Sequence, residues 1–280
     1  MNITKNSVIS GKHDKPIVAD VFYNKNSTQK PVVIFCHGYK GFKDWGAWDL
    51  MAEAFANAGF FFVKFNFSHN GGTVNQPLDF PDLEAFGNNN YTKELDDLES
   101  VIDWISNHTE YQAEINTDNI NLIGHSRAGG IVTIKAEEDN RIKKVISLAG
   151  VCDFGKRIST IGNLDEWKRE GVKYVLNGRT KQHMPHFYQF YENFVANEKR
   201  LTIKRAVSNL KIPYLIIHGD ADTSVLIEEA YNLHDWNSNS KLEIIEATNH
   251  VFGASHPWQQ DNLPKALKEA LIISIQFLNN

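Results

Sequence analysis

The chain is poor in several features that would mark particular classes of protein. It has only two cysteines in 280 residues, Cys36 and Cys152, and each lies in or beside an apolar segment. A disulfide framework needs more cysteines than this, so we expect both to be buried, reduced thiols. No basic patch of the kind that binds nucleic acid is present, and the net charge is −5. The sequence therefore gives no general attraction to nucleic acid or to an anionic membrane.

Long hydrophobic runs are missing as well. The N-terminal stretch MNITKNSVISGKHDK lacks the apolar core of a signal peptide, and no later stretch is long and apolar enough to span a bilayer. We expect a cytoplasmic protein with no membrane partner, although a chain from which a signal peptide had been removed would look the same. Hydrophobic residues make up 42% and charged residues 22% of the sequence, an ordinary globular balance with enough apolar material for a large core.

What the chain does have is an alternation of short apolar runs with helix-like segments. Several runs are apolar on both faces, as in strands that helices cover on each side. The runs lie at residues 17–23, 31–38, 60–67, 120–124, 144–150, 214–219 and 242–247. Amphipathic segments at 48–59, 92–107 and 263–280 have helical spacing. This alternation predicts an α/β fold, with a mostly parallel central sheet of about eight strands and helices on both faces.

The alternation breaks after residue 154, and no clear strand follows until Tyr214. We interpret residues 155–208 as a helical cap insertion within a single domain that spans residues 1–280, because long inserts in compact α/β domains are usually functional. The insertion is dense in aromatic rings, which either pack the cap on the body or face the cleft and favour an apolar or aromatic substrate group. These rings belong to Trp167, Tyr174, Phe187, Tyr188, Phe190, Tyr191 and Phe194.

Two strand ends carry residues that could act on a substrate. In open α/β sheets, ligands bind beyond the carboxyl ends of the strands. The stretch GHSRA at 124–128 places Ser126 between a strand and a helix, among small neighbours. This serine is a nucleophile on a strained turn or only the N-cap of the next helix. The stretch HGYKG at 37–41 offers the backbone N–H of Tyr39 to a developing oxyanion, or is an ordinary glycine turn.

Two later strand ends carry acids and a histidine. Asp220 and Asp222 follow one strand, where one of them orients a histidine or both satisfy N–H groups of the turn. His250 lies in the loop after the last strand, where an isolated histidine would be a surface residue. A serine, an acid and a histidine in this order, each after a strand, are the components of a nucleophilic triad.

Together these stretches resemble the α/β-hydrolase superfamily, over nearly the whole chain. HGYKGFKDW, FNFSHNG, GHSRAGG, HGDADTSV and NHVF look like the serine-hydrolase branch near dienelactone hydrolases, feruloyl-type esterases and prolyl-oligopeptidase-like catalytic domains. The resemblance implies an α/β-hydrolase fold and a catalytic triad of Ser126, Asp222 and His250, with the acid on Asp222 and not on Asp220. It also implies an oxyanion hole made by the backbone N–H groups of Tyr39 and Arg127.

Some details of the resemblance concern neighbouring residues. His37 would be a scaffold residue that shapes its turn. The pattern G-x-S-x-G has alanine at its last position here, Ala128, which related turns accept. Arg127 pairs with an acid from the cap or binds a carboxylate of the substrate.

The activity that this resemblance implies is hydrolysis of a small or medium carboxylic ester through an acyl-enzyme, without a metal or organic cofactor. The expected partner is a small-molecule ester, and a homodimer stays open. A peptidase or amidase would use the same triad, but the nearby peptidases usually carry a large N-terminal β domain for which this chain has no room. A binding protein that kept the fold and lost the chemistry is the third alternative.

A metal site is the remaining alternative, and the histidine pattern argues against it. His183 and His186 lie close together, as do His250 and His256. Neither pair has the i, i+4 helical spacing with an acid that zinc proteases use, and Pro185 interrupts the first pair.

Overall fold

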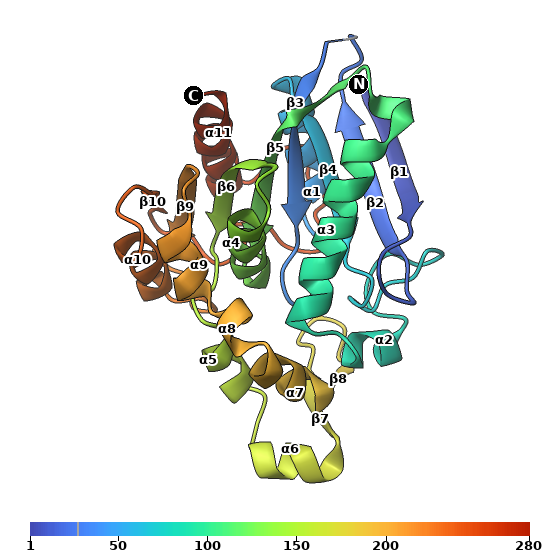
Figure 1. Cartoon of the computed structure of the whole chain (residues 1–280), viewed down its shortest axis with the longest axis vertical. Helices are drawn as coiled ribbons and strands as arrows, with labels where there is room; N and C mark the ends of the chain where they lie inside the picture. Colours follow the sequence, from blue (N-terminus) through green and yellow to red (C-terminus); the bar gives the residue numbers. More distant parts are fainter. Residues whose placement is uncertain (27) are drawn as a thin grey trace.

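The computed structural model describes residues 1–26 and 28–280, and its centre is a sheet of eight strands with helices on both faces (Figure 1). Seven of these strands fall on the predicted apolar runs. The prediction of a mostly parallel sheet of about eight strands is therefore confirmed. Across the sheet the strands are β1 (Asn2–Ile9), β2 (Ile17–Tyr23), β4 (Phe61–Asn66), β3 (Lys30–Cys36), β5 (Ile115–His125), β6 (Ile142–Leu148), β9 (Tyr214–Gly219) and β10 (Lys241–Ile245).

The strands run parallel from β4 to β10, whereas β2 pairs antiparallel with both β1 and β4. The edge strand β1 is absent from the predicted runs. Most of its side chains are exposed or half-buried, because only β2 pairs with it. A polar edge strand lacks the apolar run by which the other strands are recognised.

Helices cover the sheet in two layers. One face carries α1 (Trp48–Asn57) and α11 (Lys265–Asn279), and the opposite face carries α3 (Tyr91–Asn107), α4 (Arg127–Glu138) and α10 (Ile227–Asp235). Helix α3 begins where the side chain of Asn90 accepts the backbone N–H of Lys93. Its predicted stripe is buried against the sheet, at Leu95, Leu98, Ile102 and Ile105. Among the described helices, none is long and apolar enough to cross a membrane.

The insertion between β6 and β9 lies beyond one end of the sheet (Figure 1). The prediction of an all-helical cap at 155–208 is wrong in one respect, since the segment contains an antiparallel hairpin of β7 (Val172–Leu176) and β8 (His183–Phe187). An Asn177–Gly178 turn favours the hairpin, and Pro185 is tolerated because each strand has only one neighbour. The helices of the insertion are α5 (Phe154–Ser159), α6 (Leu164–Glu170), α7 (Gln189–Ala196), α8 (Glu198–Leu201) and α9 (Ile203–Asn209).

Five of the seven cap aromatics pack in or against the hydrophobic core, namely Trp167, Tyr188, Phe190, Tyr191 and Phe194. Trp167 and Phe190 are buried, whereas Tyr174 is exposed. The indole N–H of Trp167 donates to the carbonyl of His186 at 2.7 Å, which ties α6 to β8. The rings therefore hold the cap together and join it to the body of the protein.

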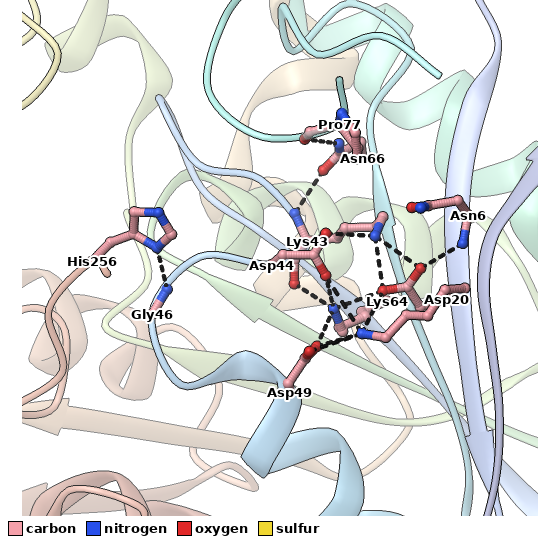
Figure 2. A network of polar contacts seen from close by, with 11 residues as sticks. Asn6, Asp20, Lys43, Asp44, Gly46, Asp49, Lys64, Asn66, Pro77 and His256 are labelled. Carbon is pink, nitrogen blue, oxygen red and sulfur yellow. Dashed lines mark hydrogen bonds and ion pairs between the residues drawn. The ribbon is translucent and has the colours of Figure 1, made fainter. Parts of the chain in front are cut away.

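A buried ion cluster lies beside the loop that follows β3 (Figure 2). Asp20 of β2 and Lys64 of β4 are register partners, and their charged groups lie 2.9 Å apart with both side chains fully buried. The ammonium of Lys43 lies 2.8 Å from Asp20, and Asp44, Asp49 and Lys5 complete the cluster. Burial would raise the pKa of Asp20, but Lys64 and Lys43 hold it well below its usual range.

The same cluster fixes the loop that carries Tyr39. Lys64 donates to the carbonyl of Lys43 at 2.9 Å, and the backbone N–H of Lys43 donates to Asn66 Oδ1 at 2.6 Å. Carboxylates of Asp20, Asp44 and Asp49 come close enough together to share a cation, but ammonium groups already lie among them. The cluster is therefore a structural clamp between the sheet and the loop.

Candidate active site

Ser126 occupies a strained turn between β5 and α4. Its φ is 59° and its ψ −122°, a conformation that a residue with a side chain rarely adopts. Ser126 stands at the N-cap position of α4, but its side chain makes no capping hydrogen bond. The N-cap alternative therefore does not account for this serine.

Small neighbours make room for the turn. A Cβ atom on Gly124 would lie 2.2 Å from the carbonyl oxygen of Ala128, and one on Gly38 would lie 2.7 Å from the Cβ of Ser126. Ala128 itself is fully buried. Glycine is required at 124 and at 38 because the backbones of three segments meet around Ser126.

Asp222 and His250 are in direct contact. Nδ1 of His250 donates to Oδ2 of Asp222 at 2.7 Å. The other carboxylate oxygen of Asp222 accepts the backbone N–H groups of Ser224 and Val225 at 2.8 and 2.9 Å. Burial would raise the pKa of Asp222, but these hydrogen bonds lower it, so the carboxylate stays ionised near neutral pH.

Asp220 has different surroundings from Asp222. It is exposed, and its carboxylate accepts the backbone N–H of Thr248 at 3.4 Å. Among the described residues, the contact with His250 is thus made by Asp222 and not by Asp220.

Two further histidines support this pair, and sequence reasoning missed them. His125 Nε2 donates to the carbonyl of His250 at 2.9 Å, and the two rings lie 4.8 Å apart. Burial and the neighbouring His250 lower the pKa of His125 to about 3, so its ring is neutral. His218 Nε2 donates to the carbonyl of Val225 at 2.8 Å, beside the turn that binds Asp222. These buried imidazoles therefore hold in place the loop that carries His250 and the turn that follows Asp222.

Ser126 and His250 line the same two cavities. A cavity of about 360 Å³ and another of about 250 Å³ are both lined by Tyr39, Lys40, Ser126 and His250. Within the described part of the chain, no hydrogen bond joins Ser126 Oγ to the imidazole of His250. Such contacts are often long without substrate and tighten when it binds.

The expected oxyanion donors lie at the same place. Tyr39 and Arg127 both line the larger cavity with Ser126. Across the described residues, neither backbone N–H has an acceptor in the protein. The phenol of Tyr39 shares a hydrogen bond of 2.9 Å with Nε2 of His186, which connects the oxyanion loop to strand β8 of the cap.

The side chain of Arg127 is enclosed rather than free. Its guanidinium lies 3.2 Å from Glu94 and 4.3 Å from the centre of the Tyr39 ring. The acid that pairs with Arg127 therefore comes from α3 and not from the cap, which corrects the prediction. Glu94 could have been noticed in the sequence, because it falls on the apolar stripe of its helix, four residues before Leu98.

The four histidines weighed as metal ligands do not converge. His183 is exposed, and His186 contacts Tyr39. His250 binds Asp222, and His256 Nδ1 accepts the backbone N–H of Gly46 at 3.0 Å (Figure 2). Each buried imidazole is thus engaged in a structural or triad-like contact of its own.

Comparisons with known proteins agree with this architecture. A family model described as the alpha/beta hydrolase fold matches residues 31–182. An Escherichia coli protein named "Uncharacterized 31.7 kDa protein in traX-finO intergenic region" is 28% identical over 153 residues, which cover 55% of this chain and 48% of that protein. The chain thus matches only about half the length of this curated relative.

Solved structures with the same fold cover nearly the whole chain. Est1E from Butyrivibrio proteoclasticus with ferulic acid bound has a TM-score of 0.71 at 19% identity, covering 98% of this chain and 100% of its own. A dienelactone hydrolase from Anabaena variabilis has a TM-score of 0.63 at 15% identity, covering 99% of this chain and 97% of its own. At these identities the likeness concerns the fold alone.

Proposed function

The chain belongs to the alpha/beta hydrolase fold family, and from that membership we propose that it is a serine hydrolase of carboxylic esters. Ser126 is the nucleophile, His250 the general base and Asp222 the acid that orients it. One observation supports the proposal above all. Ser126, which has a strained backbone and makes no capping hydrogen bond, lines the same cavity as His250, whose Nδ1 lies 2.7 Å from the buried carboxylate of Asp222.

The reaction follows from the chemistry of these groups. A serine hydroxyl is a weak nucleophile near neutral pH, so it needs a base beside its oxygen. His250 takes the proton of Ser126 as Oγ attacks the acyl carbon, and then gives it to the departing alcohol. Asp222 holds the imidazole through Nδ1 and stabilises the imidazolium that forms. Water then attacks the acyl-enzyme by the same steps in reverse order and releases the acid.

The negative charge that develops on the carbonyl oxygen also needs a partner. The backbone N–H groups of Tyr39 and Arg127 are the donors proposed for it, since both residues line the cavity and both N–H groups lack acceptors among the described residues. Losing one such donor costs about 3–4 kcal/mol of transition-state stabilisation in comparable sites. The clamp around Lys43 and Lys64 serves this step, because it fixes the loop that carries Tyr39.

Two features favour a small or medium ester. The two cavities have volumes of about 360 and 250 Å³, which suit the acyl and alcohol halves of such a substrate. The structure of Est1E with bound ferulic acid shares this fold, so aromatic acyl esters belong in the substrate series.

A fluorophosphonate probe tests the proposal directly, because it reacts only with an activated serine. We expect the wild type to be labelled and Ser126→Ala not to be, with the same thermal unfolding midpoint. Ser106→Ala is the matched control, since the hydroxyl of Ser106 bonds within α3 to the carbonyl of Ile102. Hydrolysis of nitrophenyl, feruloyl and acetylated sugar esters should fall by about six orders of magnitude in Ser126→Ala only. An unlabelled wild type would point to a binding protein instead.

A further inference from the structure

The cavities around Ser126 are lined by cations and by no carboxylate. The larger one is bordered by Lys40, Arg127 and Arg157, and the smaller one by Lys40 and Arg179. No aspartate or glutamate lines either cavity in the described part of the chain. This is notable in a protein whose net charge is −5.

The three arginines already have partners in the protein. Arg127 pairs with Glu94, Arg157 with Glu229, and Arg179 with Asp79. Arg157 also donates to the carbonyl of Ser224 at 2.9 Å. Their charges are therefore compensated before any ligand arrives.

Lys40 differs from these arginines. Among the described residues, its ammonium takes part in no ion pair and no hydrogen bond, and it lies 5.0 Å from the centre of the Tyr39 ring. The residue is half-buried and has a φ of 54°, so the fold holds its backbone in an unfavourable conformation at this point. Burial and the nearby Arg127 lower the pKa of Lys40, the direction expected of an ammonium that lacks a counter-charge.

We propose that Lys40 determines specificity by binding a carboxylate on the ester substrate. This inference rests on the proposed ester hydrolase function. Lys40 lines both cavities, as Ser126 and His250 do, so it borders the space for each half of the substrate. The walls around it are largely apolar, with Val151, Phe154 and Ile161 in the larger cavity. The preferred substrate is thus an ester with a short apolar spacer between the carbonyl and a negatively charged group.

Matched substrate pairs test the inference, after correction for uncatalysed hydrolysis. The acyl pair is mono-4-nitrophenyl glutarate and the neutral 4-nitrophenyl pentanoate, and the alcohol pair is 3-acetoxybenzoate and 3-acetoxybenzamide. We expect the wild type to favour the anionic member of at least one pair by about tenfold in kcat/KM, the gain of a charge-assisted contact. Lys40→Met should reduce this ratio to near one, and Lys40→Arg should keep it.

Lys211→Met is the matched control, because Lys211 is exposed and lies before the amino end of β9, whereas Lys40 follows the carboxyl end of β3. It removes the same charge and should leave the ratio unchanged. A ratio near one for both pairs in the wild type, or a ratio that survives in Lys40→Met, would overturn the inference while ester hydrolysis stands.

A binding measurement separates this inference from the proposed function. Calorimetry with Ser126→Ala protein compares the affinities for 3-acetoxybenzoate and 3-acetoxybenzamide, and for glutarate and pentanamide, without turnover. Tighter binding of the anion, lost when Lys40→Met is added, supports the Lys40 site even if the wild type hydrolyses no ester. Equal binding of anion and neutral partner contradicts it whatever the activity.

Discussion

Asp222 and Asp220 lie only two positions apart in the sequence, but their carboxylates differ in burial and in hydrogen bonding. Asp222 is buried, accepts hydrogen bonds from two backbone N–H groups and accepts a third from Nδ1 of His250. Asp220 is exposed and has one long hydrogen bond to a backbone N–H. An orienting acid must hold one imidazole tautomer through a short, desolvated hydrogen bond, which only Asp222 provides.

This difference makes the two asparagine variants a matched pair. Asp222→Asn should lower kcat by about four orders of magnitude, because the amide no longer fixes the imidazole in the required tautomer. Asp220→Asn should stay within about tenfold of the wild type. Steady-state kinetics on one nitrophenyl ester measures both, with circular dichroism to check the fold. If Asp220→Asn were the more severe change, the acid would have to be reassigned.

The sequence indicates the proposed reacting groups better than the residues that support them. Ser126, Asp222 and His250 can be located because each follows an apolar run and small or turn-forming residues surround it. The roles of His125 and Lys40 do not follow from the sequence, although both lie in the same strand-end stretches, because these roles depend on which residue lies opposite in space. A lysine without a counter-charge looks the same in the sequence as a lysine in an ion pair.

At the scale of elements, the turn from β5 to α4 is a tightly constrained junction of the fold. The first turn of α4 packs so closely on the end of β5 that a methyl group on Gly124 would overlap the backbone of Ala128. The overlap is with backbone atoms, so a change of side-chain rotamer cannot relieve it.

We therefore expect Gly124→Ala to destabilise the protein by more than about 3 kcal/mol or to prevent folding. Gly178→Ala is the control, since a Cβ atom there meets nothing within 4 Å in the hairpin turn of the cap. Urea unfolding of the two variants beside the wild type measures the difference. Equal stability of both variants would mean that the junction is looser than the structure indicates.

The elements also show where periodicity is informative and where it is not. Buried strands and the amphipathic helices α1, α3 and α11 follow from apolar spacing, which the sheet and its two helical layers enforce. The strand β1 and the hairpin β7–β8 do not follow from it. Each has a single strand neighbour and several exposed side chains, so burial imposes no regular pattern on their sequences.

At the scale of the whole molecule, buried imidazoles couple stability to pH. Burial lowers the pKa of His37 and His69 to about 4 and that of His125 and His186 to about 3, below the value of about 6.5 expected in the unfolded chain. Below about pH 6.5 these imidazoles are protonated in the unfolded chain but stay neutral in the folded protein. The free energy of unfolding therefore decreases as the pH falls. Burial also raises the pKa of Asp97 to about 7, which has the opposite sign, since the folded protein then holds a proton that the unfolded chain releases.

Four imidazoles against one carboxyl leave about three more protons on the unfolded chain, which corresponds to about 4 kcal/mol per pH unit. We expect the free energy of unfolding to fall at this rate between about pH 6 and 4.5. Urea unfolding at constant ionic strength measures the slope, and His186→Gln should reduce it by about one proton. A stability that is flat over this range would contradict the assignment of neutral, buried imidazoles.

The two chambers that Ser126 borders share four lining residues and otherwise draw on different parts of the chain. One is walled by α5 and β7 of the insertion together with the turn after β9, and the other by aromatic residues that precede and begin α1. Preferences for the two halves of a substrate can therefore be retuned one at a time. Re-engineering of this scaffold could change the leaving group that it accepts while the acid portion that it transfers stays the same.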